Sequence, residues 1–279
     1  MTAKTLHCLG PHGFHQLNYY EWGDPLNERV LICVHGLTRN GRDFDALANT
    51  LSSHYRVLCP DIVGRGRSAW LSCKEDYGYL RYCSDMSTLI ARSGAREVDW
   101  VGTSMGGLIG MFLAAQLGSP IRRLVINDIG PFIPKEAIER IASYVGTPVS
   151  YETMEEFERY IRTVSASFGT LNDAQWRDLA TTNARQQADG KWTSIYDPGI
   201  ALALKTALKE ITLWDIWEQV RCQTLVLRGA ESDILLKKTA EEMTRRGPQP
   251  QVIEFAGVGH APMLMAMDQI NVVKSFLLS

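Results

Sequence analysis

A serine flanked by small residues offers the clearest chemistry in this chain. The sequence Gly-Thr-Ser-Met-Gly-Gly covers residues 102–107, with Ser104 at its centre. The apolar run 98–101 before it predicts a buried strand, and the run 108–117 after it predicts a helix. A serine between glycines at a strand-to-helix turn is typical of a nucleophile whose hydroxyl is held at a helix N-terminus. The pattern therefore predicts a serine that attacks a carbonyl carbon.

A histidine can supply the base that this serine needs, and an aspartate can orient that histidine. A serine hydroxyl becomes nucleophilic when a base takes its proton, and histidine titrates near neutral pH. A carboxylate on the second ring nitrogen fixes the tautomer and stabilises the imidazolium. His260 follows a predicted strand in a Gly-x-Gly-His setting, and the aspartates that follow strands are Asp61, Asp128 and Asp233. Serine, aspartate and histidine in this chain order, each after its own strand, form the arrangement that acyl-transfer enzymes use on a parallel sheet.

The tetrahedral intermediate of acyl transfer also needs two backbone N–H donors for its oxyanion. Met105, directly after the serine, is expected to supply one. Leu37, in the loop after the predicted strand 30–34, is expected to supply the other. His35 precedes that loop, and we expect it to order the loop by hydrogen bonding rather than to act as the base.

The elements that must position these residues alternate along the chain. A continuous apolar run such as 30–34 predicts a strand that is covered on both faces, whereas the alternating segment 16–22 predicts an edge strand. The predicted strands are 16–22, 30–34, 55–60, 98–101, 123–127, 223–228 and 251–255, and the predicted helices are 44–51, 80–91, 108–117, 239–245 and 268–278. Strands and helices at this spacing predict a mostly parallel sheet with helices on both faces. Ligands bind beyond the carboxyl ends of such strands, which is where the candidate residues lie.

Residues 132–212 differ from the rest of the chain in composition and in periodicity. They show helical periodicity, many charges and scattered aromatic side chains, and they contain no convincing buried strand. We interpret them as a helical cap, or lid, inserted into a core formed by residues 1–131 and 213–279.

Five pieces of sequence together resemble the α/β-hydrolase superfamily, in its branch of capped, esterase-like serine hydrolases. The pieces are residues 34–36, 61–68, 102–107, 228–233 and 259–262. The resemblance implies an α/β-hydrolase fold: an eight-stranded, mostly parallel sheet, helices on both faces, a helical cap between strands six and seven, and no cofactor. It implies that Ser104 is the nucleophile, Asp233 the acid and His260 the base. Some relatives place the acid one strand earlier, which leaves Asp128 as an alternative, and Glu231 is a minor rival.

The expected function is that of a serine carboxylesterase. We expect hydrolysis of short- to medium-chain, uncharged esters through an acyl-serine intermediate, and some relatives of this kind also cut aliphatic polyesters or their oligomers. Hydrolysis of a C–C or amide bond and acyl transfer to an alcohol or thiol use the same triad and remain alternatives. A binding protein without catalysis is disfavoured, because all three triad residue types are present.

Composition narrows the partners and the compartment. The chain has 279 residues and a net charge of -2, which gives no reason to expect nucleic acid or an anionic membrane as a partner. No H-E-x-x-H motif or Cys/His cluster predicts a metal site. The six cysteines form no C-x-x-C pair and are interpreted as reduced thiols. With no signal-peptide pattern in residues 1–13 and no long apolar run, we expect a cytoplasmic monomer or homodimer that acts on a small-molecule ester.

Overall fold

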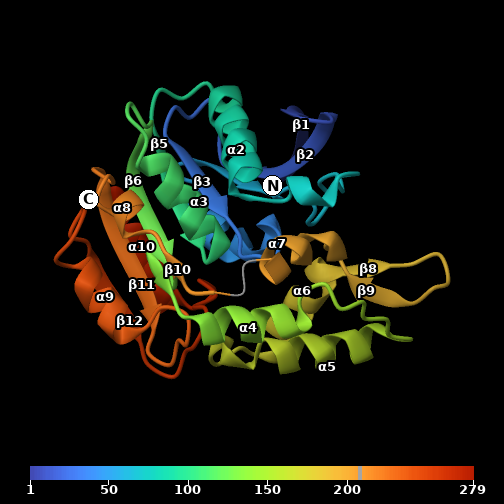
Figure 1. The fold of residues 1–279 in the computed structure, drawn as a ribbon. Coiled ribbons are helices and arrows are strands. Elements are labelled where there is room, and N and C mark those ends of the chain that lie inside the picture. The colour runs from blue at the N-terminus through green and yellow to red at the C-terminus, as the bar shows by residue number, and fades with distance from the viewer. Residues whose placement is uncertain (207–208) are drawn as a thin grey trace.

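The computed structural model describes residues 1–206 and 209–279, and an eight-stranded sheet lies at its centre (Figure 1). The strand order is β1-β2-β4-β3-β5-β6-β11-β12. β2 pairs antiparallel with β1 and with β4, and the remaining neighbours are parallel, so the predicted mostly parallel sheet is confirmed. The strands are β1 (Thr2–Gly10), β2 (Gly13–Trp22), β3 (Val30–Val34), β4 (Arg56–Pro60), β5 (Val98–Thr103), β6 (Ile121–Asn127), β11 (Gln223–Gly229) and β12 (Gln251–Phe255).

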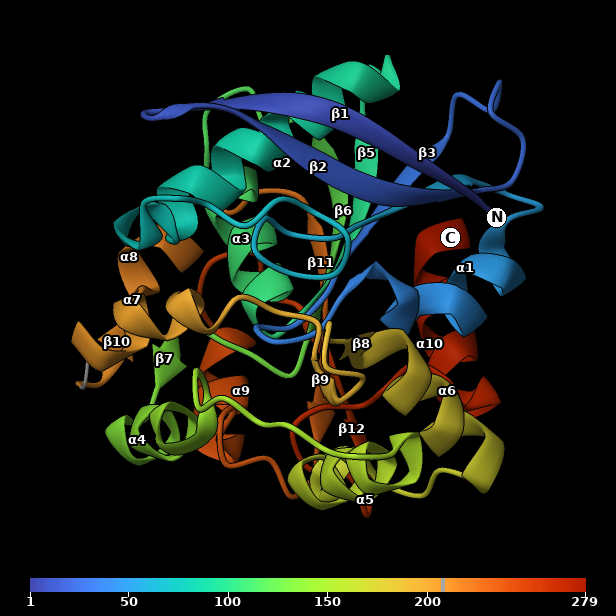
Figure 2. The same cartoon turned by 90° about the vertical axis from the view of Figure 1, so that its right-hand side faces the viewer.

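Helices cover both faces of this sheet (Figure 2). Those on one face are α2 (Tyr79–Ser93), α3 (Met105–Ala114), α8 (Trp214–Trp217) and α9 (Lys237–Met243), and those on the other are α1 (Asp45–Leu51) and α10 (Met267–Leu278). All five residues of β3 are buried. Its alternate side chains enter different hydrophobic clusters: Ile32 packs with α2 and α3, whereas Leu31 packs with α1 and α10. A strand covered on both faces therefore reads as a continuous apolar run, which is why it was predictable.

The N-terminal strand β1 was not predicted. It forms the edge of the sheet by pairing along its whole length with β2, so the segment expected as an edge strand, residues 16–22, lies one position inside. In β1 only Leu6 and Cys8 are buried. An edge strand with two inward side chains leaves too short an alternation to be recognised from sequence.

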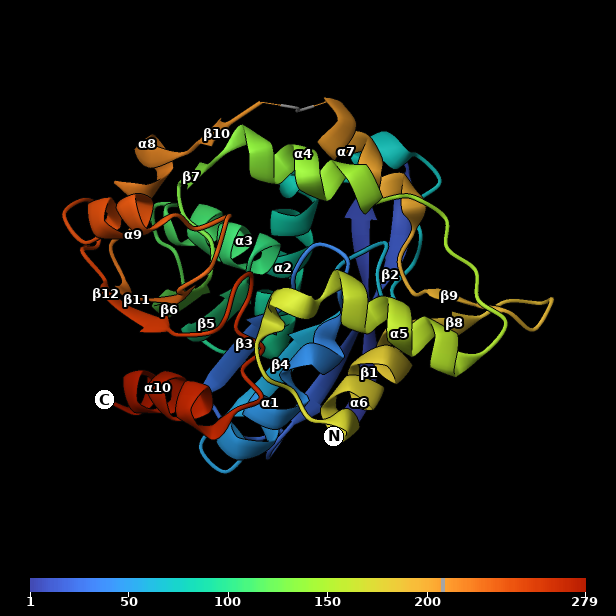
Figure 3. The same ribbon diagram turned by 90° about the horizontal axis from the view of Figure 1, so that it is seen from below.

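We call residues 132–212 the inserted segment, and its elements group at one end of the sheet (Figures 1 and 3). The elements are β7 (Phe132–Ile133), α4 (Lys135–Tyr144), α5 (Met154–Val164), α6 (Asp173–Asn183), β8 (Ala184–Gln186), β9 (Trp192–Ser194), α7 (Ala201–Thr206) and β10 (Ile211–Thr212). The terminal strands β7 and β10 pair antiparallel, with Ile133 opposite Ile211. This pair brings the two ends of the segment together where it leaves and rejoins the core.

Local sequence explains where two helices of the inserted segment begin. Helix α5 begins after Thr153, whose side chain accepts the Glu156 N–H, and helix α6 begins at a capping box formed by Asn172 and Gln175. Phe157, in α5, enters a separate hydrophobic cluster with residues of α6. Met263, from the loop after β12, packs into the same cluster. The inserted segment thus has its own small core and shares it with the loop that carries His260. Within residues 1–206 and 209–279, no helix has both the length and the apolar character needed to cross a membrane.

Candidate active site

The turn between β5 and α3 holds Ser104 in a strained backbone conformation. Its φ is 51° and its ψ is -116°, a conformation that costs a non-glycine residue about 1–3 kcal/mol. The flanking glycines are required by close approach of other backbone atoms. A Cβ on Gly102 would lie 2.2 Å from the carbonyl oxygen of Gly106, and a Cβ on Gly106 would lie 2.0 Å from that of Val34. The glycines allow the turn to be tight enough to present the serine at the helix N-terminus.

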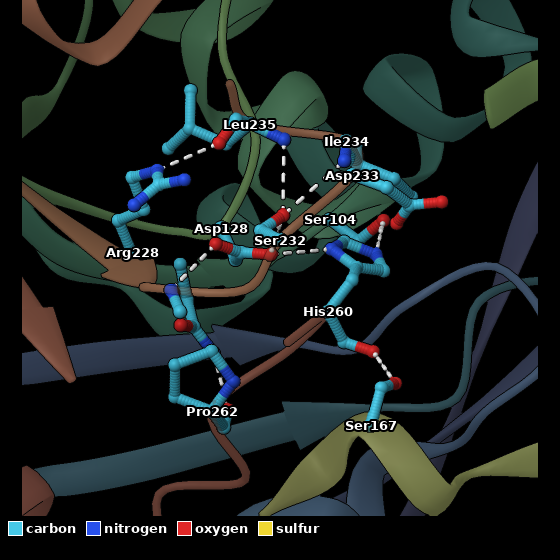
Figure 4. Close-up of polar contacts among 12 residues, drawn as sticks. Ser104, Asp128, Ser167, Arg228, Ser232, Asp233, Ile234, Leu235, His260 and Pro262 are labelled. Atoms are coloured by element: carbon cyan, nitrogen blue, oxygen red, sulfur yellow. Dashed lines mark hydrogen bonds and ion pairs between the residues drawn. The ribbon is translucent and has the colours of Figure 1, made fainter. Parts of the chain in front are cut away.

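His260 links this serine to a buried carboxylate (Figure 4). Its Nε2 lies 2.9 Å from Ser104 Oγ, and its Nδ1 lies 2.8 Å from Asp128 Oδ2. The ring can therefore accept the serine hydroxyl proton on one side while Nδ1–H donates to the carboxylate on the other. The structure brings together the two residues expected as nucleophile and base.

Asp233 does not lie beside His260, so its expected place in this chain of hydrogen bonds is wrong. Its side chain is half exposed and forms a bidentate ion pair with Arg140, at 2.6 and 3.0 Å. Asp128 takes the place instead because it directly follows β6 and adopts a positive φ of 56°. Asp233 lies four residues beyond the end of β11, after a turn in which the preceding residue, Ser232, points inward.

Three hydrogen-bond donors hold the carboxylate of Asp128. Its Oδ1 accepts the Gly229 N–H at 2.8 Å, and its Oδ2 accepts both the Ser232 hydroxyl at 2.6 Å and the ring N–H of His260. The residue is fully buried. A buried carboxylate is tolerated when its oxygens are hydrogen-bonded in this way. Sequence reasoning missed Ser232, and its only signal was its position in the turn after a buried strand.

The loop that carries His260 is fixed from two directions. Asn127, at the end of β6, donates through Nδ2 to the carbonyl of Pro262 at 2.7 Å. Ser167, from the inserted segment, donates through its hydroxyl to the carbonyl of His260 at 2.8 Å (Figure 4). Its own carbonyl accepts the Gly259 N–H at 2.7 Å. The inserted segment thus contacts the backbone of the candidate base directly.

His35 orders the loop that contains Leu37, as expected. Its Nε2 accepts the Ile62 N–H at 2.9 Å, so the proton lies on Nδ1, which donates to the carbonyl of Gly36 at 2.6 Å. Burial lowers the pKa of His35 to about 3, which keeps the ring neutral. In a trans peptide the C=O and N–H point in opposite directions. By holding the Gly36 carbonyl, His35 therefore sets the direction of the Leu37 N–H.

The second expected oxyanion donor is Met105. It is the first residue of α3, so its N–H has no acceptor within the helix. The buried Arg65 connects the two donor segments, because its Nε donates to the carbonyl of Leu37 at 2.8 Å and its Nη2 lies 3.6 Å from the Met105 sulfur. Arg65 therefore fixes the backbone of Leu37 and contacts the side chain of Met105.

A cavity of about 130 Å³ lies between Ser104 and the inserted segment. A cavity of ~150 Å³ holds one benzene ring, so this space suits a short group rather than a long acyl chain. Apolar side chains from the inserted segment, among them Ile141, Val145 and Ile161, form much of the wall. The wall also includes Arg140, which the sequence did not point out as a cavity residue.

Groups of potential metal ligands lie away from this cavity. Among the described residues, two sets of three side chains bring ligand atoms within 4.8 Å of one another, although no such cluster was apparent in the sequence. The sets are Cys8, His15 and Asp85, which are buried, and His12, Cys73 and Asp76, which are more exposed. Neither set includes a residue that lines the cavity beside Ser104.

Comparisons with known proteins agree with this architecture. Residues 31–272 match the Alpha/beta hydrolase family. The chain is 48% identical over 278 residues to a 3-hydroxybutyrate-oligomer hydrolase of Cupriavidus necator, covering 96% of this chain and 95% of the relative. A solved structure from Rickettsia typhi superposes with a TM-score of 0.94 at 31% identity, covering 100% of this chain and 99% of the other. An alpha/beta hydrolase from Novosphingobium aromaticivorans gives 0.87 at 32% identity, with coverage of 99% and 98%.

Proposed function

The chain belongs to the α/β-hydrolase family and hydrolyses esters, and we propose that its substrates are short oligomers of 3-hydroxy acids, cleaved through an acyl-Ser104 intermediate. The observation that carries the mechanism is the continuous hydrogen-bonded chain from Ser104 Oγ through His260 to Asp128. The 48% identical relative supports the substrate class. The small cavity supports short acyl units over long chains.

Acylation follows from the arrangement of these groups. His260 Nε2 takes the hydroxyl proton of Ser104 while Oγ forms a bond to the ester carbonyl carbon. The negative charge on the carbonyl oxygen is stabilised by the N–H groups of Leu37 and Met105. The tetrahedral intermediate then breaks its bond to the alcohol oxygen, and His260 returns the proton to that oxygen. The products of this half-reaction are the acyl-serine ester and a free alcohol.

Deacylation repeats these steps with water. His260 takes a proton from the water as its oxygen attacks the acyl carbon, and the proton is then passed to Ser104 Oγ as the acyl bond breaks. The free acid leaves, and the serine is regenerated. Throughout, Asp128 accepts the Nδ1–H of His260, so the ring keeps the tautomer that leaves Nε2 free to accept a proton.

We place residues 132–212 in the role of a cap over the reacting bond, and the contacts of this segment with the cavity support that role. We further propose a cytoplasmic enzyme that acts as a monomer or a homodimer on a small-molecule ester. Six free cysteines support a reducing compartment.

The test uses the purified protein with the linear dimer and trimer of 3-hydroxybutyrate. Release of monomer is measured by chromatography for the wild type, Ser104→Ala and the control Ser87→Ala, whose exposed serine lies on α2. We expect both oligomers to be cleaved by the wild type and the control and not by Ser104→Ala. Failure of the wild type to cleave either oligomer, while it turns over a p-nitrophenyl ester, would refute the substrate class and leave the esterase chemistry in place.

A further inference from the structure

Two arginine side chains line the cavity beside Ser104, and each is paired with a carboxylate. Arg39 holds Asp43 with two hydrogen bonds, at 2.7 and 2.9 Å, and Arg140 holds Asp233 in the same bidentate manner. The pairs differ in their exposure to water. The side chains of Arg39 and Asp43 are 12% and 10% exposed, whereas those of Arg140 and Asp233 are 46% and 50% exposed.

This difference decides which pair can exchange its partner. Breaking the Arg39–Asp43 pair would leave a charge unpaired in a largely buried place, which is costly. An exposed pair such as Arg140–Asp233 contributes little net stability, because water solvates both charges when they separate. Arg140 can therefore exchange Asp233 for another carboxylate at a small cost in free energy, whereas Arg39 stays paired with Asp43.

The position of Arg140 makes a carboxylate of the substrate the natural replacement. Arg140 projects from α4 of the inserted segment into the wall of the cavity that holds the nucleophile, and Asp233 reaches it from the loop after β11. The planar guanidinium fork matches a carboxylate with two parallel hydrogen bonds. A neutral ester would leave the Arg140–Asp233 pair as it is and gain nothing from it.

A linear oligomer of hydroxy acids ends in one free carboxylate, and in the dimer this group belongs to the alcohol half of the scissile ester. Resting on the function proposed above, we infer that Arg140 binds this terminal carboxylate in exchange for Asp233, so that the site favours short acidic esters over neutral ones of the same size. Asp233 neutralises the guanidinium in the empty site and competes with the substrate for it. The sequence suggested uncharged substrates because it showed no cluster of charges; Arg140 and Asp233 lie 93 positions apart and meet only in the fold.

A purely structural role for the pair is the alternative, since Arg140–Asp233 also bridges the inserted segment and the core. The two roles predict different effects of removing each partner on the preference for acidic over neutral substrates. If the pair only holds the segment in place, loss of either partner affects acidic and neutral substrates alike. If Arg140 binds substrate, removing Arg140 penalises the acidic substrate, whereas removing the charge of Asp233 favours it.

The experiment measures kcat/KM for the 3-hydroxybutyrate dimer and for the same dimer with its terminal carboxylate converted to a primary amide. The amide has the same size and no charge, and monomer release from the acyl half is followed in both cases. The variants are Arg140→Met, Asp233→Asn and the control Arg177→Met, whose side chain is 74% exposed on α6 and does not line the cavity. The quantity compared is the ratio of kcat/KM for the acid to that for the amide.

We expect the wild type to prefer the acid. Arg140→Met should lower the acid-to-amide ratio by about tenfold or more, and Asp233→Asn should raise it by about two- to fivefold, since the competing carboxylate is gone. Arg177→Met should leave the ratio as in the wild type. Raising the salt concentration should lower the wild-type ratio and leave that of Arg140→Met flat, because screening acts on the charge of the guanidinium.

Three results would overturn the inference, and the first two are distinguishable from the third. A ratio within twofold of the wild type in Arg140→Met, or a fall of the ratio in Asp233→Asn equal to that in Arg140→Met, would refute carboxylate binding while the oligomer hydrolase stands. Absence of cleavage of both dimers by the wild type would refute the proposed function and the inference together.

Discussion

Replacing Asp128 with asparagine removes the charge of the buried carboxylate and keeps its shape. The two oxygens of Asp128 serve three donors, the N–H of Gly229, the hydroxyl of Ser232 and the ring N–H of His260. Asparagine offers one acceptor oxygen and an NH₂ group that only donates. If its oxygen meets the Gly229 N–H, its NH₂ faces Nδ1 of His260. If its oxygen meets Nδ1, its NH₂ faces the buried Gly229 N–H without an acceptor.

The first orientation avoids a buried clash of two donors and is therefore favoured. It requires Nδ1 of His260 to accept, so the ring carries its proton on Nε2. In that tautomer Nε2 donates to Ser104 and cannot take its proton. The corresponding substitution in a serine protease triad lowers kcat by about 10⁴-fold, or ~5.4 kcal/mol at 1.36 kcal/mol per tenfold. We expect a loss of this order in Asp128→Asn.

The assay measures kcat for p-nitrophenyl butyrate in the wild type, Asp128→Asn and Asp233→Asn. Thermal melting of each variant shows whether it is folded. Asp233 contacts Arg140 and not His260, so Asp233→Asn should lose less than about tenfold, because its effect does not reach the tautomer of the base. The reasoning is refuted if Asp128→Asn keeps more than a tenth of wild-type kcat, or if Asp233→Asn shows the larger loss.

Further predictions concern the nucleophile, the cavity and the buried histidine. Ser104→Ala should abolish labelling by a fluorophosphonate, read by intact mass, and a labelled variant would contradict its role. Across p-nitrophenyl esters, kcat/KM should peak near about four to six acyl carbons and fall for long chains, because the cavity is small; a maximum at palmitate would contradict the size argument. Burial lowers the pKa of His35 in the folded protein to about 3, whereas the ring in the unfolded chain has the ordinary pKa of 6.5. Between these two values only the unfolded chain binds the extra proton, so the folded state loses stability as the pH falls through that range. The advantage of the wild type over His35→Gln in free energy of unfolding should therefore shrink from pH 7 to pH 4, by up to about 1.4 kcal/mol per pH unit; denaturant unfolding of both proteins measures this. The difference between the two proteins is compared because Asp61 also titrates in this pH range. Burial raises the pKa of Asp61 to about 6, which changes stability in the opposite direction and equally in both proteins. A constant difference would refute the neutral, buried assignment.

The sequence allowed most of the sheet to be predicted because its central strands are buried on both faces. β3 and β12 were predicted with the bounds that they have in the structure, and the strand before Ser104 was predicted only two residues too short. β3 is a continuous apolar run and the strand before Ser104 is apolar apart from Asp99, and polar residues of the site follow both. β12 is the exception, because it contains Gln251 and Glu254 and lies at an edge of the sheet. The edge strand β1 was missed because a half-exposed strand carries only a short alternation.

The carboxylate partner of His260 was misassigned for a different reason. Asp128 and Asp233 both follow strands, and their order along the chain does not say which one reaches the histidine. The structure separates them through the positive φ of Asp128 and the inward turn at Ser232. One sequence signal did distinguish them: Asp128 comes immediately after the last residue of its strand, whereas Asp233 lies four residues beyond.

The two hydrogen bonds between Ser167 and the His260 loop connect substrate size to the rate of the chemical step. A displacement that widens the cavity by moving the part of the inserted segment around Ser167 breaks these bonds or carries the histidine backbone with it. Widening of the cavity and misalignment of His260 are therefore coupled. A ligand that stabilises the wider cavity also stabilises the misaligned histidine. An oversized ester is then discriminated against after it has bound. Its poor turnover appears as a low kcat, while its KM can stay close to that of a good substrate.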